Sequence, residues 1–148
     1  MSEADLSGAN LSEANLSGAN LFRANLRTAN LKKANLSGAY LREALLDYAN
    51  FSHARLPQAN LRSAQMTKTI LYRVDLEGAN LRMADLRGAN LKDSYLKETD
   101  MSGAKTEGAS IAGALLIGAN LSGSDLSPRQ IEEARTLEGT ILPDGSTP

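Results

Sequence analysis

Along the chain, an apolar residue returns at every fifth position. From Leu6 to Leu126 this position, which we call i, holds leucine in twenty of 25 consecutive repeats, with no slip in register. Position i−2 is alanine in twenty repeats, position i−1 is asparagine or aspartate in sixteen, and ten of the twelve glycines stand at i+2. Self-similarity at a fixed short period is typical of a repeat architecture.

A period of five fits neither an α-helix nor a flat strand. On a helix, successive i residues would lie about 140° apart and surround the axis. In a strand they would alternate between the two faces, because five is odd. Within one repeat, however, i−2 and i share a face, and a turn at i+1 and i+2 would bring the next pair back inside. The pattern therefore predicts a coil whose sides each bury one alanine and one leucine. The Asn or Asp at i−1 would face outward and bond to the turn backbone.

The stretch Ala9–Gly38, ANLSEANLSGANLFRANLRTANLKKANLSG, resembles the pentapeptide repeat family and its A(D/N)LxX motif. The resemblance covers residues 4–126. It implies an all-β solenoid, a right-handed quadrilateral β-helix with four repeats per coil, hence about six coils that rise about 4.8 Å each. Residues twenty apart would then stack. Thr106 interrupts one stack of leucines, so we expect Thr106→Leu to stabilise the fold.

The last residues break the period. We therefore divide the chain into a pentapeptide-repeat β-helix at residues 1–126 and a C-terminal cap helix and tail at residues 127–148. Ser127-Pro128-Arg129-Gln130 has the signature of a helix start, with an N-cap serine, proline at N1 and a capping-box glutamine. We expect a short helix from about Pro128 to Thr136 and a lid over the last coil, completed by Ile131, Ala134, Leu137, Ile141 and Leu142. No such cap precedes Ala4. Two alternatives would explain an uncapped first coil: an end-to-end homodimer through the N-terminal coil, or a chain cut from a longer protein.

Composition bears on chemistry and compartment. The chain has no cysteine, which excludes disulfides and thiolate chemistry, and no apolar run of membrane-spanning length. The N-terminus lacks the features of a signal peptide, so we expect the cytoplasm, or the thylakoid lumen or periplasm if a leader has been removed. The one histidine, His53, would stack between Lys33 and Arg73, a setting unsuited to a general base. We expect no enzyme, no metal, no cofactor and no small-molecule substrate.

Charge is distributed unevenly around a net value of −1. From Asn20 up to but not including Asp75, the chain has nine basic and two acidic residues, a balance of +7 that predicts a docking strip for an acidic partner. Stacking predicts a ladder of arginines on one face, with Glu43 as a partner for one of them, and further basic residues on another face. These candidates are Arg42, Arg62, Arg82, Lys32, Lys33 and Arg73. The alternative interpretation is that these basic residues only keep the rod in solution.

A second set of candidates is apolar and stands at outward or turn positions. The first group, in neighbouring coils, is Tyr40, Leu45, Tyr48, Ile70 and Tyr72. The second group, on one face, is Tyr95, Leu115 and Ile117. Exposed clusters of this kind mark contact sites, although a stable scaffold also tolerates them.

These patterns favour a non-enzymatic protein–protein interaction scaffold that binds a protein partner through ladders on its outer faces. The family resemblance offers an alternative, a DNA mimic that modulates gyrase, a type II topoisomerase. The weak net charge and the basic central faces disfavour it. Direct nucleic-acid binding is disfavoured because no stacking platform or base-reading element accompanies the charge. A designed array is a further alternative, against which the irregular stretch from Tyr40 to Val74 argues.

Overall fold

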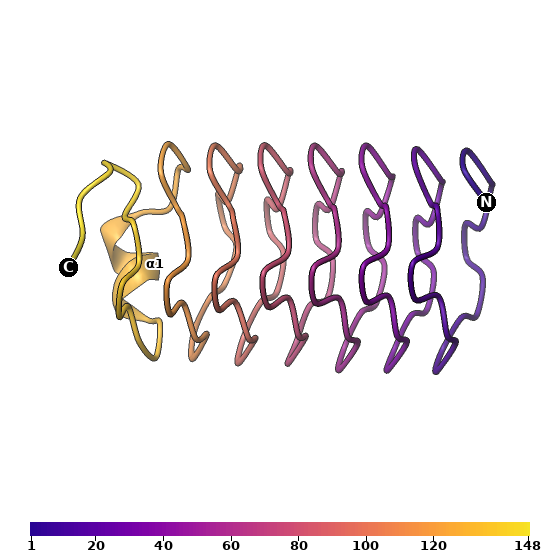
Figure 1. The fold of residues 1–148 in the computed structure, drawn as a ribbon, viewed down its shortest axis with the longest axis horizontal. Coiled ribbons are helices and arrows are strands. Elements are labelled where there is room, and N and C mark those ends of the chain that lie inside the picture. The colour runs from indigo at the N-terminus through magenta and orange to yellow at the C-terminus, as the bar shows by residue number, and fades with distance from the viewer.

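The protein is a rod of stacked four-sided coils, with the two termini at opposite ends (Figure 1). The computed structural model describes all 148 residues. Parallel β-bridges join each i−1 residue to the residue twenty positions later, from Asp5–Asn25 to Asp100–Asn120, so four repeats complete one coil. We call the stacked repeats that begin at residues 4, 24 and 44 side 1. Sides 2, 3 and 4 are the stacks that begin at residues 9, 14 and 19.

Backbone hydrogen bonds join each coil to the next. Leu6 N–H donates to Asn25 O at 2.7 Å, and Asn25 N–H donates to Ala4 O at 2.9 Å. A third bond leaves the corner, from Gly8 N–H to Arg27 O at 2.9 Å, and the same set recurs around the coil. Buried backbone groups need such partners, and here the neighbouring coil supplies them.

Alanine and leucine fill the interior, as the period predicts. The core contains 38 buried hydrophobic residues and includes the fully buried Phe51. Where threonine replaces alanine, its hydroxyl finds a backbone acceptor in the preceding coil. Thr69 Oγ1, for example, donates to Leu46 O at 2.9 Å. Leu6, Leu11 and Leu16, in the first coil, are only partly buried.

The corners share one turn geometry. Ala9 N–H donates to Leu6 O at 3.0 Å, which closes a four-residue turn, and its third residue, Gly8, has φ +66°. Fifteen non-glycine residues also have positive φ, including Lys33 at 58° and Met83 at 56°. A negative φ followed by a positive φ defines a type II turn, and the left-handed region costs a non-glycine residue about 1–2 kcal/mol. The bonds between coils over-determine the corner and offset this cost.

The outward Asn and Asp residues stabilise the same corners. In fifteen of the sixteen repeats that carry them, the side-chain oxygen accepts the backbone N–H at i+1, as Asn10 Oδ1 does from Ser12 N–H at 3.2 Å. The predicted bond to the turn backbone is therefore confirmed.

Helix α1 (Pro128–Glu132) lies at the C-terminal end of the rod (Figure 1). Its start is as predicted, with Ser127 as N-cap and a capping box with Gln130. The expected end at Thr136 is wrong, because the chain returns to the coil after α1. Thr136 pairs with Leu115 and Ile141 pairs with Asn120, each twenty-one residues apart.

Thr106 stands where the regular coil gives way to α1. Its buried hydroxyl donates to Asp125 Oδ1 at 2.6 Å, and its backbone N–H donates to the same oxygen. Gln130 Nε2 donates to Thr106 O at 3.0 Å and to Ala109 O at 2.8 Å. The Ala109 carbonyl has lost the backbone donor that the next coil supplies elsewhere, whereas the Thr106 carbonyl also accepts the Ala109 N–H at 2.8 Å. The structure argues against the prediction that Thr106→Leu stabilises the fold, because leucine would remove a hydroxyl donor from the Asp125 carboxylate.

We expect Gln130→Glu to lower the melting temperature. Glutamate keeps an oxygen for the Ser127 N–H but cannot donate to the carbonyls of Thr106 and Ala109. The Ala109 carbonyl then has no partner, and an unpaired buried group costs about 1–3 kcal/mol. Thermal unfolding followed by circular dichroism measures the effect, with Arg129→Ala in the same helix as the control. An unchanged melting temperature for Gln130→Glu would show that these two bonds do not hold the cap.

Candidate functional site

The register distributes the predicted basic residues over two opposite sides of the rod. Side 4 carries Arg42, Arg62 and Arg82, whereas side 2 carries Lys32, Lys33 and Arg73. The two faces expected from stacking are thus opposite sides of the rod, so the basic residues between 20 and 75 do not form one continuous strip. The arginine ladder itself is present on side 4, with one rung in each of three successive coils.

At one end of this ladder, Glu43 serves two arginines. Arg42 Nη2 lies 2.9 Å from Glu43 Oε1, and Arg23 Nε donates to Glu43 Oε2 at 2.7 Å. The hydrogen bond from Arg23, together with the bond from Arg42, lowers the pKa of the Glu43 carboxyl from its ordinary value. Glu43 therefore stays ionised and neutralises part of the charge that the ladder presents.

The middle rung has no such partner. Arg62 is exposed and forms no ion pair, whereas Arg82 Nη1 lies 3.4 Å from Asp100 Oδ2. Between Asn20 and Met83, side 4 holds four arginines and a single acidic residue, Glu43. This stretch of side 4 is therefore strongly positive, and Arg62 is its uncompensated centre.

A hollow of about 460 Å³ adjoins the ladder on side 4. Gly18, Asn20, Phe22, Tyr40, Arg42 and Asn60 line it. Tyr40 is 58% exposed, and the Arg23 guanidinium covers the Phe22 ring at 4.9 Å from its centroid. The ladder therefore ends beside two aromatic rings, and of the apolar candidates Tyr40 belongs to this surface.

The other apolar candidates lie elsewhere. Leu45 and Tyr48 are on side 1, and Ile70 and Tyr72 are on side 2, so the first predicted group is spread over three sides. Basic side chains cover two of its rings: Lys68 Nζ lies 5.6 Å from the centroid of Tyr48, and the Arg73 guanidinium lies 5.2 Å from that of Tyr72. These residues do not form one docking patch.

The second predicted group lies together on side 3. Tyr95 and Leu115 pair across neighbouring coils, and Ile117 follows in the same repeat as Leu115. A groove of about 190 Å³ runs beside them, lined by Arg73, Asp93, Tyr95, Gly113, Leu115 and Arg135. The Arg73–Asp93 ion pair, at 3.9 Å, spans part of this groove.

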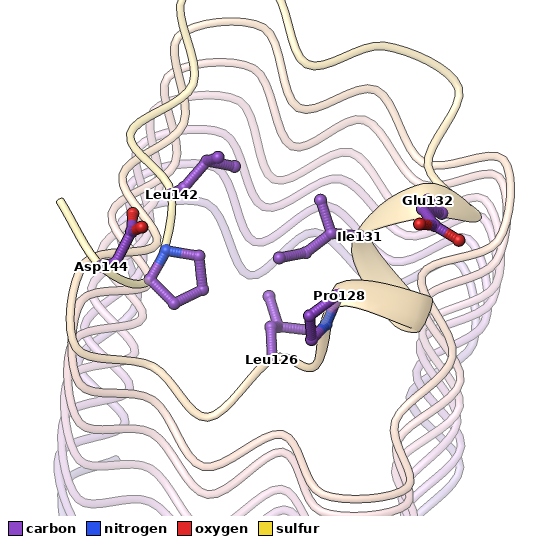
Figure 2. Close-up of a pocket in the computed structure, with 7 residues that line it drawn as sticks. Leu126, Pro128, Ile131, Glu132, Leu142 and Asp144 are labelled. Atoms are coloured by element: carbon purple, nitrogen blue, oxygen red, sulfur yellow. The ribbon is translucent and has the colours of Figure 1, made fainter. Parts of the chain in front are cut away.

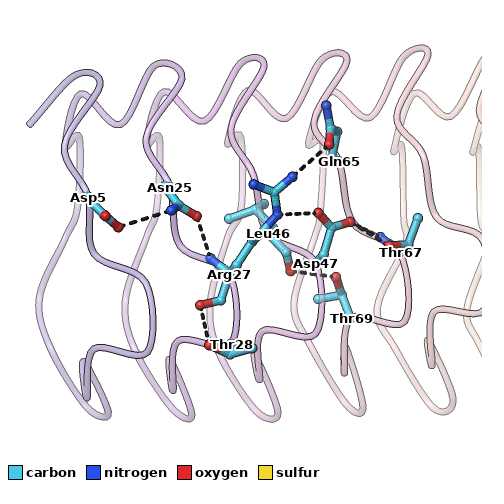
Figure 3. Close-up of polar contacts among 9 residues, drawn as sticks. All are labelled: Asp5, Asn25, Arg27, Thr28, Leu46, Asp47, Gln65, Thr67 and Thr69. Atoms are coloured by element: carbon cyan, nitrogen blue, oxygen red, sulfur yellow. Dashed lines mark hydrogen bonds and ion pairs between the residues drawn. The ribbon is translucent and has the colours of Figure 1, made fainter.

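Side 1 contains a polar network that sequence reasoning missed (Figure 3). Asp47, only 8% exposed, accepts from Arg27 Nε at 3.0 Å and from the Thr67 backbone N–H at 3.1 Å. Its carboxylate also accepts from the Thr67 hydroxyl at 2.5 Å. The signal was present, since residues 27, 47 and 67 are twenty apart and chemically complementary.

An apolar hollow of about 440 Å³ opens at the C-terminal end of the rod (Figure 2). Leu126 and Ile131 point into it from one side, and Leu142 faces them from the last coil segment. The residues after Leu126 therefore pair with the backbone of the last coil but leave a recess at the centre of the rod's end.

The remaining chemistry is sparse. His53 is exposed at a corner of side 2 and packs edge-on against Tyr72, with 5.6 Å between ring centroids. No group of three His, Cys, Asp or Glu side chains is arranged to hold a metal ion. None of the chain's helical structure has the length and hydropathy of a membrane span.

The repeat pattern and the coil geometry coincide with a known family model. The model described as pentapeptide repeats matches in eight copies, over residues 1–38, 34–71, 69–105 and 94–127. The chain belongs to the pentapeptide repeat family. Proteins of this family fold as right-handed quadrilateral β-helices and are generally structural or interaction proteins rather than enzymes.

Two solved pentapeptide repeat structures illustrate the likeness. HetL, involved in heterocyst differentiation regulation in the cyanobacterium Nostoc sp. strain PCC 7120, is 36% identical, with 100% of this chain and 76% of HetL covered and a TM-score of 0.56. QnrB1, a plasmid-mediated fluoroquinolone resistance protein, is 21% identical, with 96% and 81% covered and a TM-score of 0.51, a likeness of fold alone. No curated protein sequence matches the chain.

We expect Asp47→Ala to destabilise this pentapeptide repeat protein by about 1–3 kcal/mol, because the change leaves the Arg27 Nε–H, the Thr67 hydroxyl and the Thr67 backbone N–H without their acceptor. Urea unfolding measures the difference. Glu107→Ala is the matched control, since Glu107 occupies the same column of side 1 but is exposed and its carboxylate accepts no hydrogen bond. Equal losses in the two variants would mean that the network contributes nothing specific.

Asp85 should contribute stability that depends on pH. The hydrogen bonds from Arg87 lower the pKa of the Asp85 carboxyl from its ordinary value of 3.8. Because the folded-state pKa is the lower one, the contribution is fully present above 3.8 and is lost as the pH falls through the folded value. Asp85→Asn should therefore be less stable than wild type at about pH 7, and the gap should narrow at about pH 2. Denaturant titrations at both pH values test this, and a gap that does not change with pH would contradict it.

Proposed function

We propose that this protein is a non-enzymatic scaffold that holds an acidic protein partner against side 4. The observation that carries the proposal is Arg62, an exposed arginine with no carboxylate partner between Arg42 and Arg82. The stretch of side 4 from Asn20 to Met83 holds four arginines and one glutamate. Like charges stacked on neighbouring coils repel one another, and an acidic partner would relieve that repulsion.

The rod suits this role because its surface is fixed in advance. The hydrogen bonds between coils hold the backbone of successive arginines in one row, so binding orders side chains rather than the main chain. Complementary charge of this kind directs association and selects partners. The likeness to HetL, a protein involved in heterocyst differentiation regulation, supports a regulatory role.

The same charge argues against the DNA-mimic alternative. A mimic of DNA must present a negative surface, whereas side 4 is positive and the net charge of the whole chain is only −1. Gyrase supercoiling should therefore proceed unchanged in the presence of this protein.

The test is affinity capture from the source organism with wild type and with Arg42→Glu/Arg62→Glu/Arg82→Glu. We expect wild type to retain a specific acidic protein and the triple variant to lose it, because its charge on side 4 is reversed. Circular dichroism verifies that the variants fold.

A second triple variant separates position from net charge. Lys92→Glu/Lys105→Glu/Arg129→Glu changes the net charge equally but leaves side 4 intact, so it should retain the partner. If both triple variants lose the partner, binding depends on overall charge. If both retain the partner, side 4 is not the docking surface.

A further inference from the structure

Side 4 has a geometry that selects among acidic partners, and this inference rests on the proposed function. Its arginines stand along one margin of the side, at i+1. From Asn20 to Asn80 the neighbouring i−1 row is uncharged, with Asn20, Tyr40, Asn60 and Asn80, and Asp100 follows them in the next coil. The corner beyond that row is also uncharged, with Gly18, Gly38, Gln58 and Gly78. A partner can therefore lie along the rod on this uncharged strip and meet the arginines along one edge.

The spacing of the ladder distinguishes a helix from an extended chain. Neighbouring coils lie about 4.8 Å apart, so Arg42 and Arg82 are separated by about 9.6 Å along the rod. Residues i and i+7 on one stripe of an α-helix are separated by about 10.5 Å. Four residues of an extended strand, the nearest interval that keeps three side chains on one face, span about 13 Å. The helix matches the ladder more closely.

The hollow beside Phe22 and Tyr40 supplies an anchor at one end. Phe22 occupies the rung before Arg42 in the same column, and the hollow has a volume of about 460 Å³, enough for one large apolar side chain. A partner that binds along the ladder would therefore carry an apolar residue about one helical turn before its first carboxylate.

We propose that side 4 binds an acidic α-helix that lies parallel to the rod, with one apolar side chain in the Phe22–Tyr40 hollow. Its carboxylates recur at i+4, i+7 and i+11 from that anchor, which keeps them on one stripe. Arg62 takes an unshared carboxylate, and the partner competes with Glu43 for Arg42.

The probe is a labelled helical peptide of about 16 residues, with leucine at i and glutamate at i+4, i+7 and i+11. A second peptide has the same composition, but its glutamates are distributed around the helix. Fluorescence anisotropy gives the affinity of each for the full chain. We expect the striped peptide to bind about tenfold more tightly than the rearranged one.

Variants of the protein assign the contacts. Arg62→Gln should weaken the striped peptide by about tenfold, since a charge-assisted bond is lost. Arg55→Gln is the matched control, because Arg55 is an exposed arginine without an ion pair on side 3. Glu43→Gln should strengthen binding, because it frees Arg42 and Arg23. A gain of this kind cannot come from impaired folding. Replacing the peptide's leucine by alanine should weaken binding to wild type but not to Tyr40→Ser.

The outcomes separate this inference from the proposed function. Equal affinity for the two peptides, tighter binding of an extended polyglutamate or of duplex DNA, or indifference to Arg62→Gln would each overturn the helix inference. If the captured partner still depends on the three arginines in any of those cases, the scaffold proposal stands without it. If neither peptide nor partner depends on side 4, both fall.

Discussion

The hydrogen bond from the N–H of residue i to the carbonyl nineteen positions later, which recurs from Leu6–Asn25 to Met101–Asn120, fixes the rest of this structure. It sets the height of a coil, and therefore the separation of any two side chains in the same column. It also requires twenty residues to return to the same side, which only four equal repeats satisfy. The sequence accommodates this interaction in three ways. Alanine and leucine fill the interior, the corner residues adopt positive φ, and the Asn side chains bond to the turns.

The same constraint explains where the surface chemistry lies. Neighbours in sequence are sent to different sides, and neighbours in space come from residues twenty apart. Arg42, Arg62 and Arg82 form a ladder for that reason, and Asp47 reaches Thr67 for the same reason. The six basic candidates are thereby divided between sides 2 and 4, and side 4 places its arginine ladder beside the hollow lined by Phe22 and Tyr40.

The strictness of the period decided how much could be predicted. The buried Ala and Leu positions, the outward Asn and the start of α1 at Pro128 follow from local rules that no tertiary contact overrides. The end of α1 could not be predicted in this way. The helix shifts the register by one residue, so the coil segments around Leu137 and Leu142 no longer match the five-residue period in the sequence.

Long-range contacts set the remaining limits. The role of Thr106 depends on Asp125 and Gln130, which approach it only once the coil has given way to the cap. On the surface, the spacing of twenty residues predicted the arginine column. The hollow beside Phe22 and Tyr40 could not be predicted, because its volume depends on the side-chain conformations of neighbouring coils.

The closure of four repeats into a coil also governs which insertions the chain can absorb. Adding twenty residues within the array lengthens the rod by one rung and leaves every column continuous. Adding five keeps the interior equally well packed but turns everything beyond the insertion by a quarter revolution. An insertion of five after Arg62 would thus carry Arg82 onto the adjacent side. Insertions that hardly affect stability can therefore change which side chains lie on the surface that a partner contacts. Selection for binding would tolerate insertions of twenty residues far more readily than insertions of five.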